Sequence, residues 1–334
     1  MASAFTSQPQ SKRQRTGEVS EESELPVEVT RSEIWFEDGN IVLQAEATLF
    51  KVYRGVLAKN SAVFKSILSI PQPPSGTDAA VEGCPVVQLS DSAVDVAVVL
   101  LALFERKYVA TGETMHIDVV ASFLRLGNKY EIETLRAEAL KRLLHDYPTR
   151  IQDYSASRVI LRTEWLNIDV VNLTREQNML SILPSALYFC CQFYAGKDLV
   201  DGIPRNDGTR AKLLQGDETA CLLSLQPLVQ LQAKTTWAWL YLPPDVYSKC
   251  ETIRSGDHCG AIRQVLRDAF FPSCSLMGLL SWDKQFDSVK MCDKCNGKAR
   301  PIHDDGRVKF WNALPGIFGL PEWQELAKER VQLS

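Results

Sequence analysis

The sequence predicts an α+β fold, in which a small β-sheet with a cluster of helices precedes a mostly α-helical C-terminal region. Two observations predict it. Short apolar runs flank the turn Asp38-Gly39-Asn40, as strands do, and longer apolar runs with helical spacing follow. The chain has 334 residues, 45% of them apolar and 23% charged, which gives room for such a unit and about one or two more.

Residues 1–29 are rich in Ser, Gln and Glu and contain few large apolar side chains. Such a segment cannot bury enough surface to offset its ordering entropy, so we expect a disordered tail. Its basic cluster, Lys12-Arg13-Gln14-Arg15, has two interpretations. It is either a nuclear import signal or a solvated patch of charge.

The second unit, residues 30–146, is expected to begin with strands. Residues 32–36 and 41–45 are expected to pair as a hairpin across the Asp-Gly-Asn turn. Residues 49–68 have helical spacing, and the prolines in residues 70–76 require a loop. Residues 85–89 have the composition of a third strand.

Three helices are expected to complete this unit. Ser90-Asp91-Ser92 can cap the nearly continuous apolar run of residues 93–104. Apolar residues recur at helical spacing in residues 118–128 and again in residues 131–145. A helix that is apolar on most faces, such as the first of these, lies in a core or at an interface.

This order of elements, together with its residue types, resembles a BTB/POZ domain. That family has an aspartate-led first strand, a second strand and a helical stretch of the form HK-x-VLAA-x-S-x-x-F. The corresponding residues here are Tyr53-Arg54-Gly55-Val56-Leu57-Ala58-Lys59-Asn60-Ser61-Ala62-Val63-Phe64. Residues 121–130, which end in Lys129-Tyr130, are similar to the family's LL-x-x-A-x-K-Y stretch. The whole chain resembles a large group of fungal BTB proteins with cysteine-containing C-terminal regions.

The resemblance implies protein binding without catalysis, through a homodimer, through a cullin-type ubiquitin ligase or in a transcriptional scaffold. The sequence departs from the family where the aspartate and the His-Lys pair are usual, because Glu33 and Tyr53-Arg54 stand there. In dimeric members those residues form a charged pocket near the dimer interface. Glu33 and Arg54 are therefore either an equivalent interaction pair or two solvent-facing side chains.

The third unit, residues 147–334, is expected to be mainly helical. Residues 180–193, 211–231 and 261–271 suggest helices. Residues 237–241 alternate like a half-buried strand, with a helix end as the alternative.

The cysteines form the one sequence pattern that is typical of a metal site. The chain has nine, and without a secretory signal we expect them to be mostly free or bound to metal. Cys292-Asp293-Lys294-Cys295 can present two thiolates to one tetrahedral Zn²⁺. The candidates to complete the site are Cys250, His258, Cys259, Cys274 and His303. The preferred quartet for a structural zinc is Cys250, Cys274, Cys292 and Cys295, and the alternative is a set of ordinary thiols.

Residues 306–323 are dense in aromatic residues and turn formers, so they either bind a partner or cover a core. Arg307 and Lys309 precede Phe310 and Trp311, as in nucleic-acid platforms, but nearby aspartates offset their charge. Binding of nucleic acid is therefore not expected.

An enzyme is not expected either. His303-Asp304-Asp305 could suggest a metal-dependent hydrolase, but Gly306 makes the segment look like a turn. The chain has no GxSxG, P-loop, GxGxxG or HExxH pattern.

The sequence therefore predicts a protein–protein interaction scaffold or adaptor. The alternative is a zinc-dependent nuclear regulator that binds nucleic acid and uses the BTB unit to dimerise. A net charge of −4 creates no field that favours nucleic acid or a membrane. Since no apolar run approaches the roughly 18 residues that span a bilayer, we expect a soluble intracellular protein, cytoplasmic or nuclear.

Overall fold

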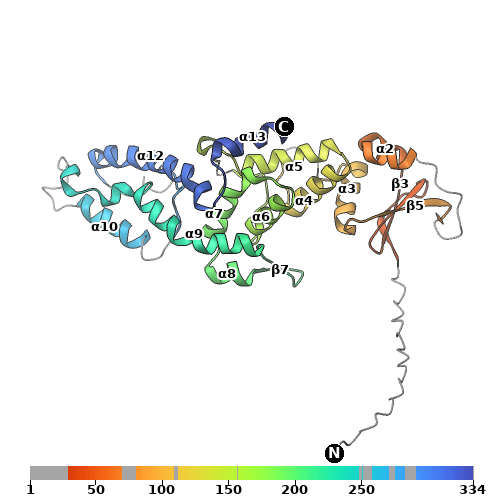
Figure 1. The fold of residues 1–334 in the computed structure, drawn as a ribbon, viewed down its shortest axis with the longest axis horizontal. Coiled ribbons are helices and arrows are strands. Elements are labelled where there is room, and N and C mark those ends of the chain that lie inside the picture. The colour runs from red at the N-terminus through yellow and green to blue at the C-terminus, as the bar shows by residue number, and fades with distance from the viewer. Residues whose placement is uncertain are drawn as a thin grey trace, which may run out of the picture.

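The computed structural model of the chain is elongated, with a small sheet at one end and helices of the C-terminal region at the other (Figure 1). The structure describes residues 29–69, 80–108, 112–155, 157–247, 250, 258–270, 275–282 and 291–333. Three features expected from the sequence lie outside these ranges: nearly all of the tail, its basic cluster and the proline loop at residues 70–76.

The sheet has five strands in the order β1-β3-β2-β5-β4. Their bounds are β1 Thr30–Trp35, β2 Ile41–Ala45, β3 Thr48–Val52, β4 Ala80–Val81 and β5 Cys84–Leu89. β2 runs antiparallel to β3 and parallel to β5, while β1 is parallel to β3 at the edge. The mixed α/β class with a helical C-terminal region is confirmed, and so is the strand at residues 85–89.

The predicted hairpin between residues 32–36 and 41–45 is wrong, because β3 lies between β1 and β2. The hairpin is β2–β3, and its turn begins at Glu46, whose φ of 50° is left-handed. β3 is buried almost throughout, so it lacks the alternation that marks a half-buried strand. The helix predicted over residues 49–68 is therefore wrong at its start, because residues 49–52 belong to β3.

Five helices pack beside the sheet. They are α1 Arg54–Asn60, α2 Ala62–Ser69, α3 Ala93–Glu105, α4 Ile117–Lys129 and α5 Glu133–Asp146. The predicted cap of α3 is confirmed, because the Oγ of Ser92 accepts a hydrogen bond from the amide of Asp95 at 3.1 Å. The helices expected at residues 118–128 and 131–145 are also confirmed.

The C-terminal region is mainly helical. Its α-helices are α6 Leu166–Glu176, α7 Leu183–Phe193, α8 Gly196–Asp201, α9 Gln215–Lys234, α10 His258–Phe270, α12 Asp293–Ile317 and α13 Trp323–Leu333. Its short elements are the 3₁₀ turns Ile151–Asp153, Leu180–Ile182, Ala238–Tyr241 and Pro244–Tyr247, and the strand pair β6 Ile203–Pro204 and β7 Arg210–Ala211.

Two expectations for this region need correction. Residues 237–241 are not a strand, because Ala238–Tyr241 form a 3₁₀ turn beyond the end of α9, which agrees with the alternative of a helix end. The segment from His303 to Gly306 is not a turn, because it lies in the middle of the 25-residue helix α12.

Most buried residues belong to one central core that continues from the sheet unit through α6, α7 and α9 to the C-terminal half of α12. Chain segments on both sides of residue 146 therefore share one interior. α13 packs over this core, and its Arg330 donates hydrogen bonds to the carbonyls of Leu144 and Ser181, each at 3.4 Å.

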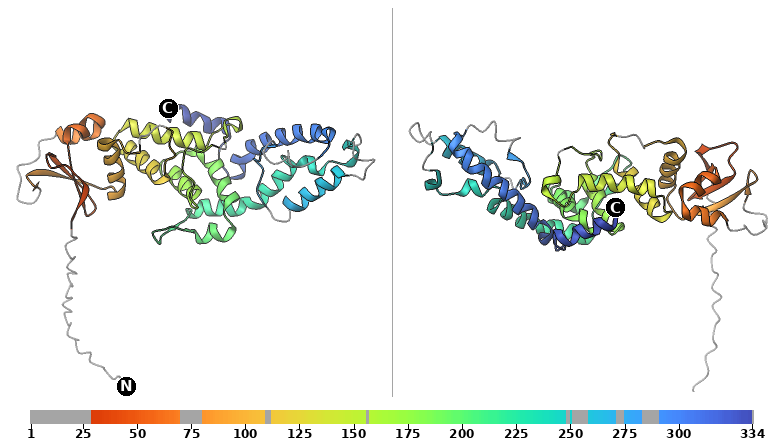
Figure 2. Two further views of the ribbon diagram at one scale, coloured as in Figure 1. Left: turned by 180° about the vertical axis from the view of Figure 1, so that it is seen from behind. Right: turned by 90° about the horizontal axis from the view of Figure 1, so that it is seen from above.

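A second core, here the distal core, lies at the end opposite the sheet. Its buried members are Trp237, Trp239, Leu240, Tyr247, Cys259, Trp282, Met291, Cys295 and Ala299. Figure 2 shows α12 running from this end to the middle of the molecule. Among the described residues, no helix has the length and apolarity to cross a bilayer.

Candidate metal centre

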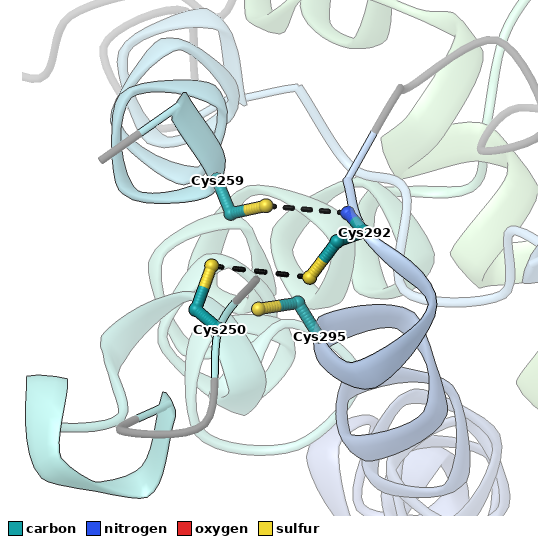
Figure 3. Close-up of side chains that lie close together, drawn as sticks. All are labelled: Cys250, Cys259, Cys292 and Cys295. Atoms are coloured by element: carbon teal, nitrogen blue, oxygen red, sulfur yellow. Dashed lines mark hydrogen bonds between the residues drawn. The ribbon is translucent and has the colours of Figure 1, made fainter. Parts of the chain in front are cut away.

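Four cysteines from three segments come together at the distal end (Figure 3). Cys250 follows the 3₁₀ turn Pro244–Tyr247, and its amide donates to the carbonyl of Tyr247 at 2.9 Å. Cys259 is the second residue of α10. Cys292 caps α12, and Cys295 lies in the first turn of that helix.

The spacing of the sulfurs fits one small metal ion. All four Sγ atoms lie within 4.8 Å of one another, and those of Cys250 and Cys292 are 3.8 Å apart. Four sulfurs about 2.3 Å from a tetrahedral Zn²⁺ would lie about 3.8 Å from each other. A disulfide needs sulfurs at about 2.05 Å, and all four residues are free thiols. The cluster can therefore bind a metal ion.

The backbone around the cluster favours thiolates. The amide of Cys292 donates a hydrogen bond to the Sγ of Cys259 at 3.2 Å. Since Cys292 is the N-cap of α12, the sulfurs of Cys292 and Cys295 also lie near the positive end of a 25-residue helix. Both contributions lower the cost of holding negative sulfur in this place.

Burial acts in the opposite direction. Cys259 and Cys295 are each 1% exposed, whereas Cys250 and Cys292 are half-buried. Burial raises the pKa of the Cys295 thiol well above its usual value, and hydrogen bonds with Cys250 and Cys292 raise it further. Cys295 is therefore a neutral thiol unless a cation neutralises the site, and metal binding would release its proton.

His303, a candidate ligand from the sequence, does not reach the cluster. Its Nδ1 accepts a hydrogen bond from the indole N–H of Trp239 at 3.3 Å, and its Nε2 lies 2.8 Å from the carbonyl oxygen of Leu280. The imidazole also contacts the rings of Trp237 and Trp282 edge-on. Both ring nitrogens are used within the distal core.

Three members of the preferred quartet, Cys250, Cys292 and Cys295, lie together in the structure, and the cysteine that joins them there is Cys259. Cys274, the fourth member of that quartet, lies outside the described residues. The signal that favours Cys259 is its short separation from Cys250, which gives two sequence-local pairs of cysteines. The side chain of His258 lies outside the described atoms.

The other described cysteines are separate from this cluster. Cys84 is buried at the sheet, and Cys190, Cys191 and Cys221 are free thiols in the central core. The expectation that the adjacent Cys190 and Cys191 do not bridge each other agrees with this.

The predicted interaction pair at the sheet is not assembled. Glu33 and Arg54 are both exposed, and the described residues contain no ion pair between them. The guanidinium of Arg54 donates to the carbonyl of Leu68, and its amide donates to Oδ1 of Asn40 at 2.8 Å. The polar neighbour of Arg54 is thus Asn40, in the turn before β2, which the sequence reasoning missed.

The aromatic C-terminal segment covers a core. Phe310 and Trp311 are 0% and 1% exposed, so neither can stack on a base. Lys309 pairs with Asp305 at 2.6 Å, and Arg300 pairs with Asp304 at 3.8 Å. The interpretation of these aromatic residues as core residues is the one that the burial supports.

No protein-family model matches the sequence, and a search of curated proteins finds no match.

Proposed function

We propose that this protein is a non-catalytic binding scaffold whose distal end is stabilised by one structural zinc ion. The cysteine cluster carries the proposal. Four thiols complete the tetrahedral shell of Zn²⁺ and leave no position for a substrate, which distinguishes a structural site from a catalytic one.

Zinc fits this donor set better than Mg²⁺ or Ca²⁺ does. Sulfur ligands favour soft or borderline ions such as Zn²⁺, whereas Mg²⁺ and Ca²⁺ require oxygen ligands. The four cysteines belong to the segment before residue 251, to α10 and to α12. A bound ion would therefore cross-link three segments that also pack together in the distal core.

The binding role rests on the N-terminal unit. Its resemblance to BTB/POZ domains, with a small sheet beside helices α1 to α5, supports binding of other proteins. The binding partner that we propose for this unit is a second copy of this chain or a cullin-type ligase subunit. The exposed Glu33 and Arg54 belong to this unit and need not form a pair for it to act.

The zinc proposal is tested by measuring the metal content of the purified full-length protein by mass spectrometry. We expect one zinc per chain, and a loss of most of it in Cys259→Ala and in Cys295→Ala. Cys84→Ala is the matched control, because it removes a buried cysteine outside the cluster and should keep the zinc. Metal-free protein with a folded distal core would overturn the proposal.

The binding role is tested separately, by light scattering of the pure protein and by titration with a purified cullin N-terminal region. A dimer or a stable cullin complex supports the scaffold. A monomer that binds no cullin, yet binds nucleic acid in a salt-sensitive manner, would replace it with the nucleic-acid alternative.

A further inference from the structure

A cavity of about 500 Å³ opens on the central helical region, remote in sequence from the cysteine cluster and from the sheet. It lies between residues 158–164, the start of α6, the C-terminal end of α7, α8 and the start of β6. Its volume is within the range of cavities that bind small molecules, roughly 300–1,000 Å³.

The charged residues that line this cavity form no ion pair with another described residue, although Arg158 donates a hydrogen bond to the carbonyl of Asp146 and the carboxylate of Asp198 accepts the amide of Ala195 at 3.2 Å. Two are cationic, Arg158 and Arg162, and two are anionic, Glu164 and Asp198. The ion pairs of the described residues include none of the four. The cavity therefore offers two unneutralised charges of each sign, in contrast to the surface around α3 and α4, where Lys129 pairs with Asp91 at 2.7 Å.

The remaining wall is apolar and aromatic. Phe193 is 57% exposed at the cavity. Ile203, Pro204 and the rings of Tyr147 and Tyr194 also line it. An apolar group bound there would cover the exposed face of Phe193.

The wall is held in place before any ligand binds. Tyr147 donates to Oδ1 of Asn167 at 3.4 Å, and the hydroxyl of Tyr194 accepts the amide of Asn167 at 3.3 Å. The guanidinium of Arg158 lies 4.9 Å from the ring centre of Phe189 and 5.3 Å from that of Tyr147. Such pre-organisation reduces the entropy lost on binding.

We propose that this cavity binds a small zwitterion with an apolar side chain, of the size of an unblocked dipeptide. Its carboxylate would lie at Arg158 and Arg162, its ammonium group at Glu164 and Asp198, and its apolar side chain against Phe193. Such a ligand matches both pairs of charges and the apolar wall together, whereas a simple anion or cation would match only one sign. The inference is independent of the zinc and scaffold proposals.

The test is calorimetric titration of the full-length protein with leucyl-phenylalanine, its N-acetyl form, its C-terminal amide and free phenylalanine. We expect leucyl-phenylalanine to bind, and each blocked form to bind roughly threefold more weakly or worse, the effect of one ion pair in a half-enclosed site. Phenylalanine that binds more tightly than the dipeptide would identify a free amino acid as the occupant.

Two variants test which charged side chain binds each end of the dipeptide. Arg162→Gln should reduce the preference for the free carboxylate over the amide, and Glu164→Gln should reduce the preference for the free amine over the acetylated form. Both residues are exposed, so neither change should unfold the chain. Lys59→Gln, at an exposed position on α1, is the control and should bind like the wild type. Absence of binding, or equal affinity for free and blocked dipeptides, would overturn the proposal.

Discussion

Cys295 and His303 are both buried at the distal end of α12, but Cys295 belongs to the sulfur cluster and His303 does not. Cys295 faces three other sulfurs, while His303 has both ring nitrogens bonded to neighbours. An indole N–H only donates, so Nδ1 of His303 must be the unprotonated nitrogen and Nε2 donates to the carbonyl of Leu280. The imidazole is therefore fully hydrogen-bonded in its neutral form.

This neutral histidine predicts acid sensitivity. Burial lowers the pKa of His303 from 6.5 to about 4. Between these values the unfolded chain binds a proton that the folded chain does not, so stability is lost as the pH falls from 6.5 towards 4, by roughly 3 kcal/mol. We expect urea unfolding to show this loss, and His303→Gln to lose less than the wild type over the same range.

Cysteine protonation at a bound metal also destabilises the protein in acid, but it affects wild type and variant alike. The difference between the pH profiles of wild type and variant therefore measures the contribution of the His303 imidazole to stability. Parallel profiles would show that His303 contributes no pH dependence.

At this scale the sequence predicted part of the cysteine cluster but not all of its members. The Cys292-x-x-Cys295 spacing predicted that two thiols of the cluster lie together, because both belong to one turn of chain. The choice between Cys259 and Cys274 depended on how α10 folds back towards α12, and spacing along the chain does not contain that information. The partners of Arg54 likewise come from other segments, the turn before β2 and the end of α2, which spacing along the chain does not reveal.

Among the elements, α12 departs most from local propensity. It contains Pro301 and Pro315 and three glycines, residues that disfavour a helix interior by about 1 kcal/mol for Gly and about 3 kcal/mol for Pro. Burial of Phe310, Trp311 and Leu314 in the central core offsets that cost. The sequence therefore suggested a turn where tertiary packing produces a helix, whereas the Ser92 cap of α3, a local feature, was predicted correctly.

Two glycines of α12 test this account of packing. A Cβ at Gly306 would lie 2.3 Å from the carbonyl oxygen of Thr235, whereas a Cβ at Gly297 would have no neighbour within 4 Å. We expect Gly306→Ala to destabilise the fold by about 1–3 kcal/mol through overpacking. Gly297→Ala should be neutral or stabilising by up to about 1 kcal/mol.

Urea unfolding midpoints measure both effects under one condition. The two changes are the same in chemistry and lie in the same helix, so helix propensity alone would give them the same sign. Equal effects at both positions would contradict the close approach of α12 to the residues that follow α9.

Across the whole molecule, two cores are joined by α12. At 25 residues this helix is about 37 Å long, and it extends from the cysteine cluster to the central core. The mixed class and most helices of the sheet unit could be predicted from the sequence, because their apolar periodicity is local. The continuous core across residue 146 could not, because it depends on which distant helices meet.

Metal removal should act on one end of the molecule. With a strong zinc chelator, we expect faster amide hydrogen exchange in residues 258–270 and 293–303, while β2, β3 and α4 stay protected. The reason is that the distal core is small and a bound ion would cross-link its segments through the cysteines, whereas the central core has no cysteine cluster of this kind among its described residues.

Hydrogen-exchange mass spectrometry on one sample with and without chelator resolves the two regions. Faster exchange throughout the chain would show that the cores unfold together, and no change anywhere would show that the ion has no structural role.

The contacts of α13 have a consequence for biosynthesis. Its Arg330 donates to the carbonyls of Leu144 and Ser181, and the carboxylate of its Glu329 accepts the amide of Ser181 at 3.1 Å, so a late segment of the chain closes over helices made much earlier. On the ribosome, the central core, which spans both sides of residue 146, cannot close before the later helices emerge, and the end of α5 keeps its carbonyls exposed until α13 is released. Nascent chains stalled before residue 323 should thus be the species that chaperones hold longest.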